Sequence, residues 1–256
     1  MKKIYAKNET GFALVWIGLY VVVMNIALRF CGGFDNLAAK TAEQLLVPVG
    51  CILLLAVLST MWIVKNGLTE KYGLCRFRGG MRSWLWFIPL AVMSCINLKN
   101  GLTLTAPVLV AVLMAVNMAV AGYVEEVIFR GFLFRAMAKD SLKGAVIVSA
   151  VTFGAGHIVN LGNTADVTGV LLQVCYAIAI GFLYTVIVYK GGSLWPCVLS
   201  HMFVNGSSVF AAEHGAFTRM VQSLGGTSPQ AVQVYSAALI IAIAGGYALW
   251  LWKKAA

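Results

Sequence analysis

The sequence predicts an all-α, polytopic membrane protein that crosses the bilayer about eight times. Of its 256 residues, 61% are hydrophobic and 11% are charged. Soluble domains contain about 45–50% apolar residues and about 25% charged residues. A water-soluble fold could not bury so much apolar surface. The apolar residues also lie in runs close to the length that a transmembrane helix needs, about 20 residues. These observations exclude soluble enzymes, DNA-binding domains, disordered tails and secreted disulfide scaffolds.

The apolar runs place the expected spans in order along the chain. Glycine-rich turns separate several of them, for example at 31–33, 191–193 and 225–229. Alternating ten-residue strands, which a membrane β-barrel would require, are absent. We expect helices at residues 11–30, 44–64, 83–98, 104–128, 144–161, 167–189, 193–212 and 230–252. They would form a single integral membrane domain over residues 1–256.

The distribution of positive charge predicts the orientation of these spans. The chain has 19 Lys and Arg against 9 Asp and Glu, a net charge of +10. The loops between the expected spans fall into two alternating sets, one on each side of the membrane. One set holds only four basic residues, Arg29, Lys40, Lys99 and Arg219, and the other set holds the remaining fifteen. By the positive-inside rule, the basic loops and both termini should therefore be cytoplasmic. Those loops contain Lys2, Lys3, Lys7, Lys65, Lys71, Arg76, Arg78, Arg82, Arg130, Arg135, Lys139, Lys143, Lys190, Lys253 and Lys254.

Topology also explains the excess charge without a charged partner. The basic residues sit in short turns and form no extended stripe with interleaved aromatic residues. We therefore expect the lipid bilayer as the surroundings and no nucleic acid as a partner. The six cysteines show no C-x-x-C spacing, and five lie in or at the edge of apolar runs; we expect them to be packing residues and not a disulfide framework or a zinc site.

A few polar side chains lie where topology does not require them. Ionisable groups inside a bilayer are costly and by default mark function. Glu126 and Arg130 are four residues apart on one helix face and can form an ion pair, while Glu125 is rotated by about 100° and presents a separate carboxylate. His201 and Asn205 share a face by the same spacing. The full set is Glu125, Glu126, Arg130, His157, His201 and Asn205.

Helix geometry brings these residues to similar depths. At 1.5 Å per residue, Glu125, His157 and His201 lie about 16–21 Å from the nearest lysine of a basic loop. They can therefore meet in one cavity, which we expect to open toward the cytoplasm. A helix over residues 104–139 would be about 53 Å long. It must tilt, break near Tyr123 or run along the interface after Arg130.

The motifs Glu-Glu-x-x-x-Arg-Gly at 125–131, Phe-x-x-x-His at 153–157 and His-x-x-x-Asn at 201–205 resemble those of the CPBP intramembrane endopeptidases. This group includes type II CAAX prenyl proteases and bacteriocin-processing and immunity proteins. The resemblance covers residues 104–212, the expected catalytic core. It implies hydrolysis of peptide bonds in peptide or membrane-protein substrates, and a location in a bacterial plasma membrane.

Carried over by position, the resemblance also implies residue roles. Glu125 would be the general base for an attacking water molecule, and His157 would help to hold and polarise that water. His201 and Asn205 would stabilise the oxyanion. Glu126 and Arg130 would form a supporting structural pair. Fixed hydrogen-bond donors in a site of low dielectric suit such a reaction.

The need for a metal stays open at this point. Glu125, His157 and His201 could bind zinc, and the family has been described as metalloproteases for that reason. However, the His-Glu-x-x-His motif is absent and Asn is an uncommon zinc ligand. We favour a reaction without metal or other cofactor, with zinc as the alternative.

Two other function classes compete with a protease. A non-catalytic membrane scaffold or bacteriocin-immunity protein could share the fold, although loss of a site residue would then be expected and none is lost. A proton-coupled transporter could use Glu125 and His157 as a relay. The absence of an inverted repeat and of paired broken helices weighs against the transporter.

Overall fold

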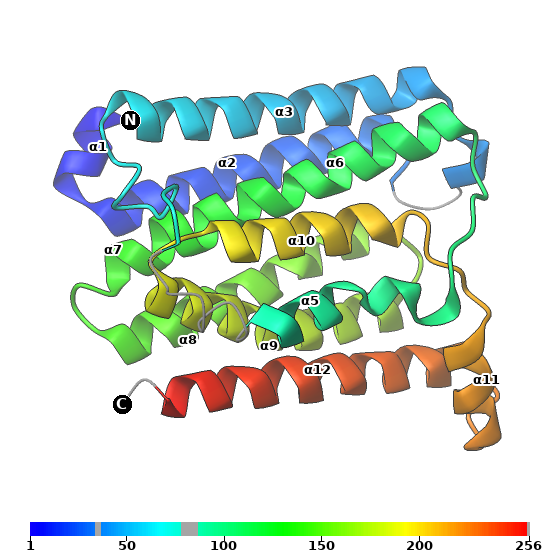
Figure 1. Ribbon diagram of the computed structural model, residues 1–256. Coiled ribbons are helices and arrows are strands. Elements are labelled where there is room, and N and C mark those ends of the chain that lie inside the picture. Colours follow the sequence, from blue (N-terminus) through cyan, green and yellow to red (C-terminus); the bar gives the residue numbers. More distant parts are fainter. Residues whose placement is uncertain (34–36, 78–86, 255–256) are drawn as a thin grey trace.

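The computed structural model describes residues 1–33, 37–77 and 87–254, and helices dominate all three segments. The long helices lie side by side along one common axis (Figure 1). Within the described residues, the only β-type pairing is one isolated bridge between Leu102 and Ala211. The prediction of an all-α fold is confirmed.

Six helical segments in the described part of the chain are long and apolar enough to cross a membrane. They support a polytopic membrane protein, but the expected number of eight is not confirmed. The six are α2 (Glu9–Phe30), α3 (Ala42–Lys65), Val108–Met137, Leu142–Gly162, α9 (Val167–Gly191) and α12 (Pro229–Lys253). Val108–Met137 combines α6 (Val108–Glu126), η4 (Val127–Phe134) and α7 (Arg135–Met137), and Leu142–Gly162 combines α8 (Leu142–Gly156) and η5 (His157–Gly162).

The two remaining expected spans form shorter helices. The first residues of 83–98 lie outside the described residues, and α5 (Ile88–Ser94) is followed by the short helix η3 (Ile96–Asn100). The span expected at 193–212 is α10 (Trp195–Ser208), which has 14 residues. That length rises only about 21 Å, less than a hydrocarbon core of about 30 Å. α10 ends in a run of Asn, Gly and Ser, which weakens the helix.

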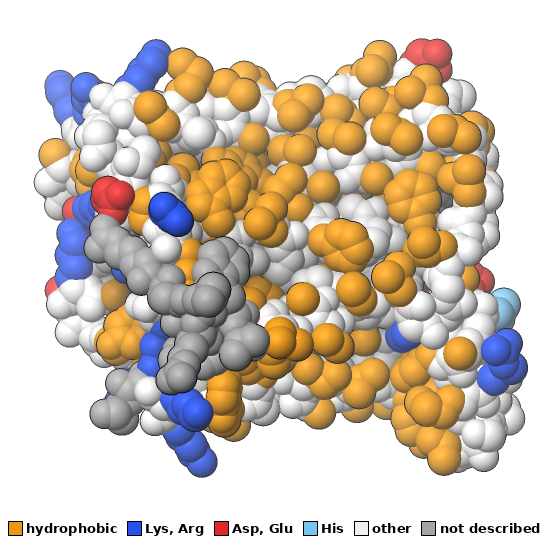
Figure 2. Space-filling model, viewed as in Figure 1, with side chains coloured by type: hydrophobic (Ala, Val, Ile, Leu, Met, Phe, Trp, Pro, Cys, Tyr) orange, Lys and Arg blue, Asp and Glu red, His pale blue; other side chains and the backbone are white. Residues whose placement is uncertain are grey.

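Both termini lie at the same end of the bundle (Figure 1). Lys and Arg side chains gather at this end, and apolar side chains cover much of the middle of the visible face (Figure 2). We call it the basic end; it includes α1 (Lys2–Lys7) and the turn between α7 and α8. The opposite end carries η1 (Leu37–Ala39) and α11 (Ala216–Ser223). An even number of crossings fits this arrangement, whereas its cytoplasmic orientation stays a prediction.

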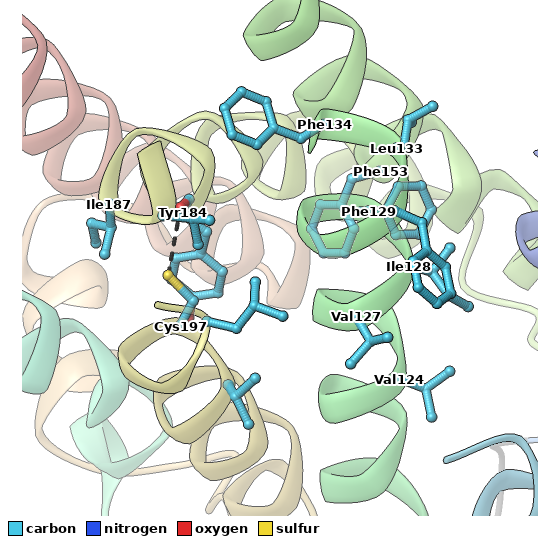
Figure 3. Packing of buried hydrophobic residues seen from close by; sticks show 14 of the residues in the cluster. Val124, Val127, Ile128, Phe129, Leu133, Phe134, Phe153, Tyr184, Ile187 and Cys197 are labelled. Carbon is cyan, nitrogen blue, oxygen red and sulfur yellow. Dashed lines mark hydrogen bonds between the residues drawn. The ribbon is translucent and has the colours of Figure 1, made fainter. Parts of the chain in front are cut away.

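The core forms around the helix that carries the two glutamates. α6 packs against α3 and α10, and η4 packs against α2 and α8. Figure 3 shows the apolar side chains of this helix facing residues of α8, α9 and α10. Close approach depends on glycine: a Cβ atom at Gly181 of α9 would lie 3.1 Å from the Ala150 Cα atom of α8. The glutamates are thus held by neighbours on several sides.

A cluster of aromatic rings fills the half of the bundle nearest the basic end. Phe132 makes edge contacts with Phe12, Trp62 and Tyr72, at ring-centroid distances of 5.1, 5.7 and 5.0 Å. Trp16 lies 5.9 Å from the same ring. Such edge-on pairs add stability beyond the area that they bury. We call these five residues the aromatic plug.

Candidate active site

The helix that carries the glutamates changes from α to π geometry directly after Glu126. α6 ends at Glu126, and Val127–Phe134 forms the π-helix η4. π-helical turns are rare and often occur at functional sites. The continuous helix starts only at Val108 and ends at Met137, so it is shorter than the expected 104–139. Of the three alternatives expected for this helix, a break near Tyr123 does not occur, because the helix continues without interruption and only changes type after Glu126.

Glu126 and Arg130 form the ion pair that their spacing predicts. Arg130 Nη1 lies 2.8 Å from Glu126 Oε1, and both side chains are fully buried. The guanidinium group also stacks over the ring of Phe153 at 4.2 Å and near that of Tyr184 at 5.5 Å. A buried charge needs such compensation because it has lost its hydration. The aromatic rings and Glu126 together provide that compensation for Arg130.

His201 connects this pair to the second glutamate. Its Nδ1 atom lies 2.8 Å from Glu126 Oε1, and its Nε2 atom lies 3.4 Å from Glu125 Oε2. Because the carboxylate of Glu126 is an acceptor already paired with Arg130, Nδ1 of His201 is the atom that donates. α10 comes this close because residue 122 is glycine: a Cβ atom there would lie 3.1 Å from the His201 carbonyl carbon.

Glu125 has a partner that the sequence analysis missed. The hydroxyl group of Tyr20 on α2 donates a hydrogen bond to Glu125 Oε1. The two residues are 105 positions apart, and nothing in the motifs connects them. The one available signal was the position of Tyr20 in the middle of its helix, because membrane tyrosines usually lie near the interface. Glu125 is thus held by a phenol on one side and an imidazole on the other.

His157 begins the short helix η5, directly after α8. Its Nδ1 atom lies 3.0 Å from the carbonyl oxygen of Phe153, and its ring makes an edge contact with the Phe153 ring at 5.1 Å. A carbonyl oxygen can only accept, so Nδ1 carries the proton and Nε2 remains an acceptor. The ring of Phe153 also contacts His201 at 5.7 Å. One phenylalanine therefore orients both histidines.

A cavity of about 120 Å³ brings most of the predicted site residues together. Glu125, His157 and Asn205 all line it, together with Tyr20 and Phe153. His201 reaches this cavity only through its contact with Glu125 Oε2. A buried carboxylate, an imidazole acceptor and an amide donor around one small cavity can hold and activate a water molecule.

This cavity extends away from the basic end. Its wall includes Asn25 near the end of α2 and Asn160 in η5, and Met118, Asn160 and Gln173 also border a larger cleft of about 730 Å³. Asp166 and Glu213 line that cleft. We expected an opening toward the basic loops. The described residues instead place it toward the opposite end, because the aromatic plug fills the space on the basic side.

A metal site would have to form from residues that already have other contacts. Glu125, His157 and His201 are the expected zinc ligands; Nδ1 of each histidine has a partner, and Nε2 is the nitrogen that a metal ion would use. Among residues 1–33, 37–77 and 87–254, no group of three or more His, Cys, Asp and Glu side chains is placed to hold a metal ion. Metal dependence is therefore a question for experiment.

Comparison with known proteins gives a family for the central part of the chain. Residues 107–207 match the family model described as Type II CAAX prenyl endopeptidase Rce1-like. The matched segment contains every motif residue from Glu125 to Asn205, and it confirms the resemblance to CAAX-type proteases. No curated protein and no solved structure matches the chain. Together with the six apolar helices, the match supports a membrane-embedded peptidase that acts on peptide substrates.

Proposed function

We propose that the protein is an intramembrane endopeptidase in which Glu125 activates a water molecule, with the match of residues 107–207 to CAAX-type proteases as the premise. One observation carries the proposal: Glu125, His157 and Asn205, from three separate helices, line one buried cavity. Burying polar and ionisable groups inside a membrane protein costs free energy, and such groups usually mark a functional site.

In the proposed reaction, Glu125 removes a proton from water as the water attacks the scissile carbonyl carbon. His157 Nε2 accepts a hydrogen bond from the same water and orients it. Glu125 then transfers the proton to the leaving amine, so the protein ends in its starting state. A well-placed general base of this type contributes about 10²–10⁴-fold to the rate.

Asn205 is the proposed donor to the oxyanion, because its amide lines the cavity next to Glu125. His201 was expected to share this role. Since both of its nitrogens face carboxylates, we propose that it chiefly positions the two glutamates relative to each other. Removal of one oxyanion donor typically lowers kcat by about 10²–10³-fold.

The remaining assignments complete the proposal. Glu126 and Arg130 form a fully buried ion pair, and this pair supports the site through the contact of Glu126 with His201. The reaction uses no metal or other cofactor, and zinc held by Glu125, His157 and His201 is the competing mechanism. The substrates are peptides or membrane proteins, and the protein resides in a bacterial plasma membrane.

A comparison of peptide termini in host cells tests the proposal. Cells carry the wild type, Glu125→Gln or His157→Ala at matched membrane levels, and mass spectrometry identifies new protein termini. We expect termini that occur with the wild type and are absent with both variants, because neither substitution removes the helix packing. Identical termini in all three cultures would overturn the proposal and favour a non-catalytic scaffold or immunity protein.

A further inference from the structure

The wall of the cavity contains one buried amide without a partner. Asn117 of α6 is 2% exposed, and its Oδ1 atom makes no hydrogen bond with any described residue. It lies two helical turns before Glu125 and lines the same cavity. An unpaired buried acceptor destabilises the folded state, and a donor on a bound ligand could pair with this oxygen.

Three of the other amides that line the cavity, those of Asn25, Asn160 and Gln173, have hydrogen-bond partners. Asn160 Nδ2 donates to Gln173 Oε1 at 3.0 Å, and Asn163 Nδ2 donates to Asn25 Oδ1 at 2.9 Å. These pairs fix the amides of α2, η5 and α9 around the cavity. Asn117 lines the same cavity from α6, and its Oδ1 atom has no such partner.

The shape of the space suits an extended chain. Asn117 lies about 12 Å along the helix from Glu125, which an extended peptide covers in three to four residues at about 3.3 Å each. Met118, Asn160 and Gln173 border both the cavity and the larger cleft. The cleft and the cavity that holds Glu125 are therefore neighbours with a common wall.

The chemistry of the wall restricts the side chains of such a peptide. Apart from Glu125 and the histidine at 157, the described residues that line the cavity are uncharged. Met24 and Leu28 contribute apolar surface between the amides. A charged side chain in this stretch would lose its hydration without gaining a partner.

We infer that Asn117 is a substrate-binding residue, whose Oδ1 atom accepts a hydrogen bond from a backbone N–H three to four residues from the scissile bond. The ligand class is an extended, uncharged peptide segment that reaches the site from the end opposite the basic end. This inference rests on the proposed endopeptidase function. It adds a contact outside the motifs and a position on the substrate.

The test uses the full-length protein in detergent and a fluorogenic peptide that spans a terminus found only with the wild type. Asn117→Leu keeps the side-chain volume and removes the acceptor. We expect KM to rise about tenfold, as for loss of one hydrogen bond, with kcat within about threefold of the wild type. Because an unpaired buried group disappears, the unfolding temperature should stay equal or rise.

A matched control separates binding from structure. Asn97 Nδ2 donates to the Val204 carbonyl oxygen at 2.6 Å and to Ser207 Oγ at 3.1 Å, away from the cavity. Asn97→Leu should therefore lower the unfolding temperature and leave KM of the folded enzyme unchanged. Asn117→Leu should therefore raise KM without lowering the unfolding temperature, and Asn97→Leu should lower the unfolding temperature without changing KM.

Peptide length provides a second readout that a structural role would not change. With peptides shortened to one residue on each side of the scissile bond in turn, one truncation should remove the difference in KM between the wild type and Asn117→Leu. An unchanged KM for Asn117→Leu with the full peptide would overturn the inference and leave the endopeptidase proposal intact. Failure of the wild type to cleave any peptide, with Glu125→Gln indistinguishable from it, would instead overturn the endopeptidase proposal.

Discussion

Nδ1 of His201 lies 2.8 Å from Oε1 of Glu126, the oxygen that Arg130 also binds at 2.8 Å. The other nitrogen of the same ring faces Glu125. The buried ion pair and the proposed general base are therefore connected through one imidazole ring. A change in the ion pair should affect both stability and the position of Glu125.

The first prediction concerns Glu126→Gln. This substitution leaves Arg130 buried without a full counter-charge, and breaking one partner of a buried pair typically costs about 3–5 kcal/mol. We expect a much lower unfolding temperature in detergent, and a smaller loss of turnover per folded molecule than Glu125→Gln causes. Glu213→Gln, on an exposed residue, is the control and should change stability little. A Glu126→Gln protein as stable as the wild type would show that the pair does not support the fold.

The second prediction concerns Tyr20→Phe. The ring keeps its packing, but the hydrogen bond to Glu125 is lost. Hydrogen bonds to charged groups contribute about 1.5–3 kcal/mol, so kcat should fall by about 10-fold to 100-fold with little change in unfolding temperature. Tyr123→Phe is a matched control, because its hydroxyl group pairs with Thr60 instead. Equal kcat for Tyr20→Phe and the wild type would remove Tyr20 from the site.

The sequence predicts local features of this molecule well. Long apolar runs give the six candidate spans, because helix length and hydropathy are properties of one segment. The pairing of Glu126 with Arg130 follows from helix periodicity alone. The approach of Glu125, His157 and His201 to one another follows from their matching depths, and the position of Asn205 follows from its spacing to His201.

Features that depend on which helices are neighbours were not predictable. Tyr20 meets Glu125 only because α2 packs on the π-helix that follows α6, and periodicity carries no information about such contacts. The direction of the cavity depends on how the rings of Phe12, Trp16 and Phe132 fill the basic half. α10 is short because it ends in polar residues and a glycine. A hydropathy value averaged over the whole apolar run does not show where such a helix ends.

The third prediction concerns metal dependence. Nε2 of His157 is left as an acceptor that could bind zinc, but the described residues place no group of three or more His, Cys, Asp and Glu side chains to hold a metal ion. We expect that EDTA and 1,10-phenanthroline leave cleavage of the fluorogenic peptide by the purified protein unchanged. A loss of activity that added Zn²⁺ restores would replace the proposed mechanism with a metal-dependent one, while the peptidase function would stand.

The fourth prediction concerns the side of the membrane from which substrate arrives. If the basic end is cytoplasmic, as the positive-inside rule indicates, then the cavity opens toward the outer face. In a background with the native cysteines replaced, a membrane-impermeant maleimide added to intact cells should label His214→Cys. Asp140→Cys, in the turn between α7 and α8, should react only after permeabilisation; both residues are exposed. The reverse labelling pattern would place the opening toward the cytoplasm, and the charge-based orientation would then be wrong although the geometry of the cavity would not change.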